Sequence, residues 1–242
     1  FLDDKTTKID QAIAIKQKQI ELLKERRQIL IHKAVTRGLN DKVKLKDSGV
    51  EWIGEIPEHW GVAKIKQCSE RISKGTTPST EGREILNEGE VRFLKSENIF
   101  EGFITEKPLF FIDKKTDFIM RRSSLKLDDV LFVIAGASLG KVAVLTNEFL
   151  PANTNQAVAF IRPNKKILPY FLSNFLISNT IKDLTWLEAV QSAQPNLSME
   201  NLGNFPITLP PKEEQKQIVE FIEIASTKIA TAISLKEQEI EK

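Results

Sequence analysis

Apolar residues recur at alternating steps of four and three along the first 39 residues, the pattern of a helix with a single seam. No Gly or Pro interrupts this stretch before Gly38, and glycine is the usual C-terminal helix cap. A helix of about 36 residues would be roughly 55 Å long, too long to be buried on one compact domain. We therefore expect it to pair with another helix. Its seam positions are Leu2, Thr6, Ile9, Ile13, Lys16, Ile20, Leu23, Arg27, Leu30 and Ala34.

The same pattern returns at the end of the chain. Phe1–Leu22 aligned without a gap on Phe221–Lys242 gives nine identical pairs at an offset of 220 residues. Glu213 and Glu214 follow Pro211 and supply the acidic first turn that a helix dipole favours. The sequence therefore predicts a second long helix from Pro211. The side chains expected between partner helices are Leu2, Ile9, Ile13, Ile20, Leu23, Leu30, Ile222, Ile229, Ile233 and Ile240.

Between these two stretches the apolar runs are short and mostly strand-like. Val130–Leu145 consists of an apolar run, a Gly-containing turn and a second apolar run, which predicts a buried hairpin. Trp52 and Trp60 are interpreted as core residues, because buried aromatic side chains mostly serve packing. The other expected elements are short strands in Val62–Ile65, Val91–Leu94, Phe110–Ile112, Val158–Ile161 and Phe205–Leu209, and one or two helices over Leu168–Val190.

These patterns predict an α+β fold class, with a mixed, β-rich domain flanked by two long helices. The expected segments are a long helix over 1–39, a linker and docking segment over 40–60, the β-rich domain over 61–210, and the second long helix over 211–242.

Composition and charge narrow the class of protein. With 41% apolar residues, 28% charged residues and no apolar run near about 18 residues, the sequence predicts a globular protein without a membrane span. The single Cys68 excludes an internal disulfide framework and is typical of a reducing compartment. Residues 1–46 carry 12 Lys/Arg against 6 Asp/Glu, whereas residues 47–211 carry 18 against 20. Nucleic-acid binding by the middle would therefore depend on local clusters of cations.

Known catalytic and metal-binding patterns do not occur in the sequence. His32 and His59 have no second His or Cys at ligand spacing, which argues against a zinc site. Asp128-Asp129 precedes an apolar run, where a turn favours Asp. Gly136–Val142 resembles a phosphate-binding loop, but it is one residue short, has Val142 in place of the hydroxyl residue and leads into a strand pattern. We expect no catalytic residue and no metal.

Polar loops offer binding chemistry instead. They combine Asn and Gln, which read adenine, with Lys and Arg, which read guanine, and with hydroxyl groups that contact phosphates. Solvated loops are polar in any protein, so residue types alone leave both interpretations open. The loops are Lys74–Thr80, Lys95–Asn98, Arg121–Ser124, Ser138–Lys141, Asn153–Gln156 and Gln191–Asn196.

Taken in order, several stretches resemble one half of the specificity subunit of type I restriction-modification systems: a conserved helix, a target-recognition domain and a second conserved helix. The resemblance covers essentially the whole chain. The stretches are Lys8–Leu39, Lys46–Lys66, Lys74–Pro78, Leu127–Lys141, Gln194–Leu197 and Leu209–Ile218.

The resemblance implies an architecture and a set of partners. In that family two recognition domains, each reading one half of a split DNA sequence, are held apart by two long antiparallel helices. Adenine-N6 methyltransferase subunits dock on the helical regions, and motor-nuclease restriction subunits join them. S-adenosylmethionine and ATP would then belong to those other chains, in the cytoplasm of a bacterium or archaeon.

The sequence has one recognition domain, and both its ends fall within a helix. We expect a piece of a two-domain subunit, with a half-subunit that pairs with a second copy of itself as the alternative. Two other hypotheses are an interaction scaffold without sequence preference and the recognition part of a fused methyltransferase-nuclease. The residues expected to contact DNA are Lys74, Thr76, Thr77, Lys95, Ser96, Asn98, Ser138, Lys141, Asn155, Gln194 and Asn196.

Overall fold

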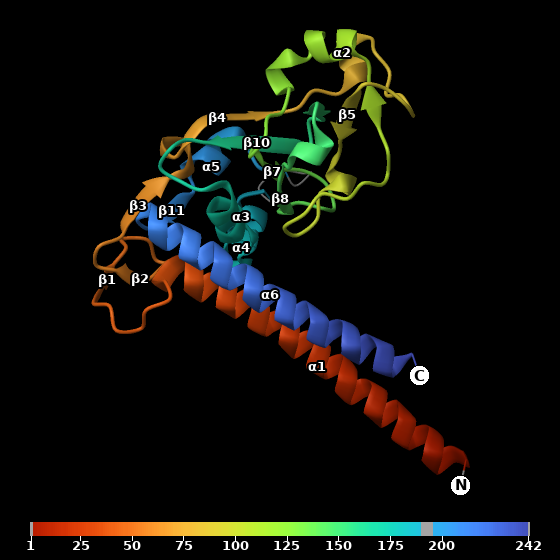
Figure 1. The fold of residues 1–242 in the computed structure, drawn as a ribbon, viewed down its shortest axis with the longest axis vertical. Helices are drawn as coiled ribbons and strands as arrows, with labels where there is room; N and C mark the ends of the chain where they lie inside the picture. Colours follow the sequence, from red (N-terminus) through yellow and green to blue (C-terminus); the bar gives the residue numbers. More distant parts are fainter. Residues whose placement is uncertain (1, 190–195, 242) are drawn as a thin grey trace.

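The computed structural model describes residues 2–189 and 196–241. Its two long helices, α1 (Leu2–Arg37) and α6 (Lys212–Ile240), lie side by side and antiparallel (Figure 1). Gly38 has a φ of +73°, and its N–H donates to the Ala34 carbonyl oxygen at 3.1 Å at the end of α1. The predicted pair of long helices and the left-handed cap are therefore confirmed.

Four small sheets are formed by the described part of the segment between the long helices. The largest is antiparallel and contains, in spatial order, β4 (Ser69–Lys74), β10 (Val158–Pro163), β7 (Val130–Val133) and β8 (Val142–Val144). A second sheet contains β6 (Phe111–Ile112), β5 (Val91–Leu94) and β9 (Ala152–Thr154), of which β5 and β9 are parallel. The remaining sheets pair β1 (Leu45–Asp47) with β2 (Glu55–Pro57), and β3 (Gly61–Lys64) with β11 (Pro206–Leu209).

The shorter helices connect and cover these sheets. The α-helices are α2 (Lys114–Ile119), α3 (Pro169–Ile177), α4 (Asn179–Ala189) and α5 (Met199–Asn204). The single-turn 3-10 helices are η1 (Ile65–Gln67), η2 (Pro78–Glu81), η3 (Ser96–Asn98), η4 (Arg121–Ser123) and η5 (Asn147–Phe149).

The four-stranded sheet is buried on both faces. Successive side chains of a strand point to opposite sides, and both sets pack into hydrophobic clusters. Phe132 and Ile161 pack on the face that α3 and the long helices cover, whereas Leu131 and Phe160 pack toward the β5 sheet. Figure 1 shows α3 and α4 between this sheet and the helix pair. One hydrophobic core therefore continues from the sheet into the base of the helix pair.

Side chains of the 40–60 segment fix the helix pair to the domain. Trp60 is 1% exposed, and its Nε1–H donates to the carboxylate of Glu214 on α6 at 3.0 Å. The partly buried ring of Trp52 lies 6.0 Å from that of Phe175 on α3. The Thr208 hydroxyl of β11 donates to the Val35 carbonyl oxygen of α1 at 2.5 Å. The core interpretation is therefore confirmed for Trp60, whereas Trp52 is partly buried and packs against the core.

The predicted strands, the hairpin and the two central helices are all present. The strands and α-helices that were not predicted are β1, β2, β4, β9, α2 and α5, which have three or six residues each. Such elements are too short to show a period, and β9 lies partly inside the expected loop Asn153–Gln156. Within the described ranges, no helix has the length and apolar character needed to cross a membrane.

Candidate nucleic-acid interface

Strand ends from two sheets meet at one place on the β-rich domain. The backbone N–H of Thr76, just after β4, donates to the carbonyl oxygen of Thr154 at 3.2 Å. The Thr154 hydroxyl at the end of β9 donates to the carbonyl oxygen of Leu94 at the end of β5, at 2.7 Å. A Cβ on Gly75 would lie 1.9 Å from the Thr154 oxygen, so only glycine allows this approach. The loops that follow β4, β5 and β9 therefore adjoin.

The start of the hairpin turn after β7 and the segment around Asn196 lie next to these loops. The backbone N–H of Ile134, after β7, donates to the Ala157 carbonyl oxygen at 2.9 Å. Ala135 forms an isolated antiparallel bridge with Asn196, and Leu197 N–H donates to the Ile134 carbonyl oxygen at 2.9 Å. We call Lys74–Thr77, Asn155–Ala157 and Asn196 the strand-end cluster.

Several of the predicted contact residues lie in this cluster with side chains that reach the surface. Lys74 and Asn196 are exposed, and Thr76, Thr77 and Asn155 are half-buried. The Asn155 Oδ1 accepts a hydrogen bond from the Ala157 N–H at 3.2 Å, while its Nδ2 makes no hydrogen bond to the described part of the chain. Gln194 lies outside the described residues.

The prediction for Asn98 is wrong. Its side chain is 0% exposed, its Oδ1 accepts from the Lys95 N–H at 3.1 Å, and its Nδ2 donates to the carbonyl oxygens of Thr105 and Pro108. Asn98 therefore holds its own loop together and cannot contact DNA. Nothing in the sequence next to Asn98 indicated this burial, because its Nδ2 donates to carbonyl oxygens of residues seven and ten positions later.

The other predicted residues are half-buried and lie outside the cluster. Lys95 Nζ is 2.5 Å from the Glu97 carboxylate and 3.9 Å from the centroid of the Phe110 ring. Lys141 Nζ lies 4.4 Å from the Phe100 ring centroid, next to a loop whose Glu101 pairs with Arg27 of α1. Ser96 and Ser138 complete this group, and their contact with DNA stays a prediction.

Three arginines beside the cluster were not among the predicted contact residues. The Nη2 of Arg71 on β4 donates to the Arg122 carbonyl oxygen at 2.7 Å, which places η4 against β4. Within residues 2–189 and 196–241, Arg71, Arg121 and Arg122 form no ion pair. The adjacent Arg121 and Arg122 were a visible signal in the sequence, but only the fold shows that they lie next to β4.

Asp129 and Arg162 form an ion pair inside the β-rich domain. Both oxygens of the Asp129 carboxylate accept hydrogen bonds from Arg162, at 2.8 and 2.7 Å, and Asp129 is 0% exposed. Burial raises the pKa of Asp129, while Arg162 and the Lys126 N–H lower it. The interpretation of Asp128-Asp129 as turn residues fits, since Asp128 has a φ of +68°.

The histidines serve packing and pairing. His32 Nδ1 lies 3.3 Å from the Thr180 hydroxyl, and burial lowers the pKa of His32. His59 Nε2 lies 2.7 Å from the Glu214 carboxylate. In the part of the chain that the structure describes, no group of three or more His, Cys, Asp or Glu side chains could hold a metal ion.

The antiparallel register of the long helices decides which seam residues are buried. Lys16 pairs with Glu239, Lys236 Nζ donates to Gln19 at 2.6 Å, and Arg27 Nε donates to Ser226 at 3.2 Å. Of the predicted interface residues, Ile20, Ile222 and Ile229 are buried, and Ile13, Leu23, Leu30, Ile233 and Ile240 are partly buried. The side chain of Leu2 lies outside the described residues.

Ile9 does not pack between the two long helices of this chain, and its place in a partner-helix interface stays a prediction. It is 60% exposed. Facing residue numbers in the pair add to 255 for Lys16 with Glu239, so Ile229 faces a position near residue 26 of α1.

A second row of apolar side chains runs along the helix pair. Its members each precede a seam position by one residue, so that a rotation of about 100° turns them away from the seam. Residues that follow a seam position, such as Ile31 and Ala230, face the domain. Residues that precede a seam position lie on the opposite side of the antiparallel pair, so this row faces away from the domain. The row, which we call the outer stripe, consists of Ile15, Leu22 and Ile29 on α1 and Phe221 and Leu235 on α6, exposed by 59%, 51%, 59%, 39% and 56%.

Comparison with known proteins gives relatives of one kind. The family described as "Type I restriction modification DNA specificity domain" matches residues 57–242. The type I restriction enzyme MjaVIII specificity subunit of Methanocaldococcus jannaschii is 30% identical over 239 residues, which cover 96% of this chain and 54% of that protein. The EcoBI specificity subunit of Escherichia coli is 27% identical over 92% of this chain and 47% of its own length. The chain therefore spans about half the length of these curated relatives.

Solved structures share the fold. The HsdS subunit from Thermoanaerobacter tengcongensis superposes with a TM-score of 0.59 at 19% identity, over 95% of this chain and 49% of that one. A chain from a structural study of complex assembly and conformational transition of the type I R-M system gives a TM-score of 0.74 at 14% identity, over 99% of this chain and 53% of that one.

Proposed function

Because this chain belongs to the family of type I restriction-modification DNA specificity domains, we propose that its strand-end cluster reads one half of a bipartite DNA target. The observation that carries the proposal is the meeting of loops from separate sheets beside three arginines without a carboxylate partner in the described chain. Donors and acceptors from several loops match the pattern that base edges present in the major groove. Cations beside them match the phosphates.

Within this proposal the residues divide into two roles. Asn155 and Asn196 supply side-chain amides for base edges, and an amide that contacts adenine at two atoms discriminates by about 1–3 kcal/mol. Lys74, Arg121 and Arg122 contact phosphates and fix the position of the duplex without reading its sequence. The chain itself would carry out no reaction, because S-adenosylmethionine and ATP would be bound by partner subunits.

The decisive experiment is co-expression of this chain with the adenine-N6 methyltransferase subunit of its own system, followed by sequencing of methylated adenines. We expect one repeated sequence element at every modified site. A palindromic bipartite site would indicate two copies of this chain, and an asymmetric one a second recognition domain. Methylation at adenines that share no sequence would overturn the proposal in favour of a scaffold without sequence preference.

The outer stripe is the surface that we propose for docking the methyltransferase. It lies on the side of the helix pair that turns away from the recognition domain, so a partner can cover it while the domain holds DNA. Exposed isoleucines and leucines at intervals of seven residues fit the apolar face of another helix.

Leu22→Asp tests this surface, with Gln11→Asp as the control at an exposed position of α1 outside the stripe. We expect Leu22→Asp to weaken association with the methyltransferase about tenfold or more, because it places a charge in an apolar contact. Isothermal titration or gel filtration of the mixed subunits would measure this. Equal association of both variants and the unaltered chain would exclude the outer stripe as the docking surface.

A further inference from the structure

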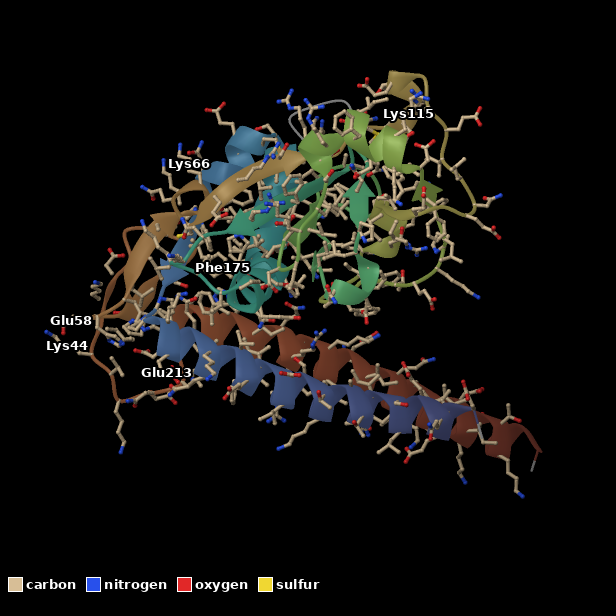
Figure 2. The ribbon with its side chains drawn as sticks, turned by 45° about the horizontal axis from the view of Figure 1, so that its top comes forward. Lys44, Glu58, Lys66, Lys115, Phe175 and Glu213 are labelled. Atoms are coloured by element: carbon tan, nitrogen blue, oxygen red, sulfur yellow. The ribbon has the colours of Figure 1, made fainter. Side chains whose placement is uncertain are left out.

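The edge of the domain most distant from the helix pair carries an exposed aromatic ring. Phe118 on α2 is 69% exposed, and its neighbour Ile119 is 38% exposed. Figures 1 and 2 show α2, with the labelled Lys115, at this edge. A single exposed apolar residue is common, but here the ring is flanked by cations.

The helix that carries Phe118 is held firmly. Its first turn is capped by Asp113, whose Oδ1 accepts from the Thr116 N–H at 2.6 Å. The Asp117 carboxylate accepts from the Ser124 hydroxyl at 3.0 Å and from the Asn153 Nδ2 of β9 at 2.8 Å. Phe118 is therefore presented by a fixed element, and little conformational entropy is lost when it is covered.

The charges around the ring fit a polyanion. Arg121 Cζ lies 5.1 Å from the Phe118 ring centroid, and its Nη1 is 3.4 Å from the Phe118 carbonyl oxygen. Among the described residues, Lys115, Arg121 and Arg122 have no ion-pair partner. A methyltransferase surface would have to neutralise these cations, whereas DNA phosphates do so directly.

The position of α2 continues the proposed DNA surface. Asn153 Nδ2 also donates to the Met120 carbonyl oxygen at 3.2 Å, and Asn153 directly precedes Thr154 and Asn155. Arg71 connects Arg122 to β4, which leads to Lys74. Both strands that end in the strand-end cluster therefore carry the segment that presents Phe118.

We infer that Phe118 is an apolar wedge that inserts between two adjacent base pairs of the bound duplex, while Arg121 and Arg122 hold the flanking phosphates. Apolar side chains of DNA-binding proteins open base steps in this way, and pyrimidine–purine steps open most easily. The wedge would add sequence preference at a step that no side chain reads by hydrogen bonds. The inference rests on the proposed function.

The test uses the chain co-expressed with its methyltransferase and duplexes of the mapped target in which 2-aminopurine replaces single bases. The fluorescence of 2-aminopurine rises when the base is unstacked. Away from the methylated adenines, which the methyltransferase itself turns out of the stack, we expect a rise at one step with the unaltered chain, its loss with Phe118→Ala, and its retention with Phe118→Trp. Stacking of one base on an aromatic ring corresponds to about a fivefold or greater change in affinity, so Phe118→Ala should weaken binding by at least that factor.

Phe103→Ala is the matched control, because Phe103 is 55% exposed and lines the groove between the domain and the helix pair. It should leave affinity and fluorescence unchanged. Equal fluorescence and affinity for Phe118→Ala and the unaltered chain would overturn the wedge and leave the proposed function intact. Loss of methyltransferase association instead of DNA affinity would also overturn it. Absence of DNA binding by the unaltered chain would overturn both proposals.

Discussion

Single residues fix the strand-end cluster through contacts that allow no substitute. Gly75 is buried, and its Cα hydrogen faces the backbone of Thr154, which ends β9 of another sheet, and of Asn155, which follows β9. Any side chain would separate β4 from the loop after β9. The cluster therefore depends on a residue without functional groups of its own.

Gly75→Ala should destabilise the domain. The new Cβ would lie 1.9 Å from the Thr154 oxygen and 2.4 Å from the Asn155 oxygen, so backbone must shift. We expect a loss of at least about 1–3 kcal/mol in the free energy of unfolding, measured by urea titration with tryptophan fluorescence. Gly61→Ala is the control, since no atom lies within 4 Å of its added Cβ. Equal stability of the two variants would contradict the close approach.

Arg162 can be tested in the same way, with pH as a second variable. Arg162→Met leaves the fully buried Asp129 carboxylate unpaired, which should cost about 3–5 kcal/mol at neutral pH. Burial already raises the pKa of Asp129, and removal of Arg162 raises it further. The charged form is then the costly one, so the loss should shrink as the pH falls through that pKa and Asp129 becomes neutral.

Arg71→Met is the matched control for Arg162→Met. Arg71 lies opposite Arg162 on β4, and both guanidinium groups lie over Phe160, at 5.7 and 5.4 Å. Arg71 has no carboxylate partner among the described residues, so its replacement removes the hydrogen bond to Arg122 but should show no such pH dependence. A loss for Arg162→Met that is independent of pH would exclude the unpaired carboxylate as its cause.

At the scale of elements, the internal repeat places the same side chain in two environments. Ile9 and Ile229 are aligned by the repeat, yet Ile9 is 60% exposed and Ile229 is 9% exposed. The antiparallel register produces this difference, because Ile229 faces the middle of α1. Identical sequence positions therefore contribute unequally to stability.

Ile229→Ala should lower the free energy of unfolding by about 2 kcal/mol or more, because it removes buried methyl groups from the seam. Ile9→Ala should change it by less than about 0.5 kcal/mol, because the side chain is already in water. Thermal and urea unfolding of both variants would measure these values. Equal losses at the two positions would contradict the register.

At the scale of the whole molecule, some Lys and Arg side chains form ion pairs with carboxylates and others do not. Several cations of α1 and of the residues just before β1 pair with carboxylates, as in Lys16 with Glu239, Arg37 with Glu55 and Lys44 with Glu58. Arg121 and Arg122 on the β-rich domain form no ion pair with the described residues. The net excess of charge on the first helix is therefore a poor guide to where DNA would bind.

Arg122→Ala should weaken DNA binding for every sequence alike and lower the slope of log affinity against log salt by about 1, the effect of one lost phosphate contact. Lys44→Ala should leave the slope unchanged, because Lys44 lies just before β1 and pairs with Glu58 at 3.2 Å. Fluorescence anisotropy at several salt concentrations would measure both. An unchanged slope for Arg122→Ala would remove Arg122 from the interface.

Prediction from the sequence succeeded where a signal was periodic or local. The long helices, the Val130–Leu145 hairpin and the Gly38 cap were found because each repeats or ends within neighbouring residues. It failed for Asn98, whose burial depends on carbonyl groups of a later loop. It also missed the six-residue α2, which is shorter than two helical turns.

The sequence by itself determined the two helices, the Val130–Leu145 hairpin and the family, since periodicity, turn residues and motif order are written along the chain. The tertiary structure alone decided that Thr76, Leu94 and Thr154 meet, because strand pairing joins residues far apart in sequence. It also decided that Arg71 supports Arg122 and that α2 presents Phe118 beside the cluster. Hydrogen bonds between distant segments create the proposed surface, and residue types at single positions do not specify such bonds.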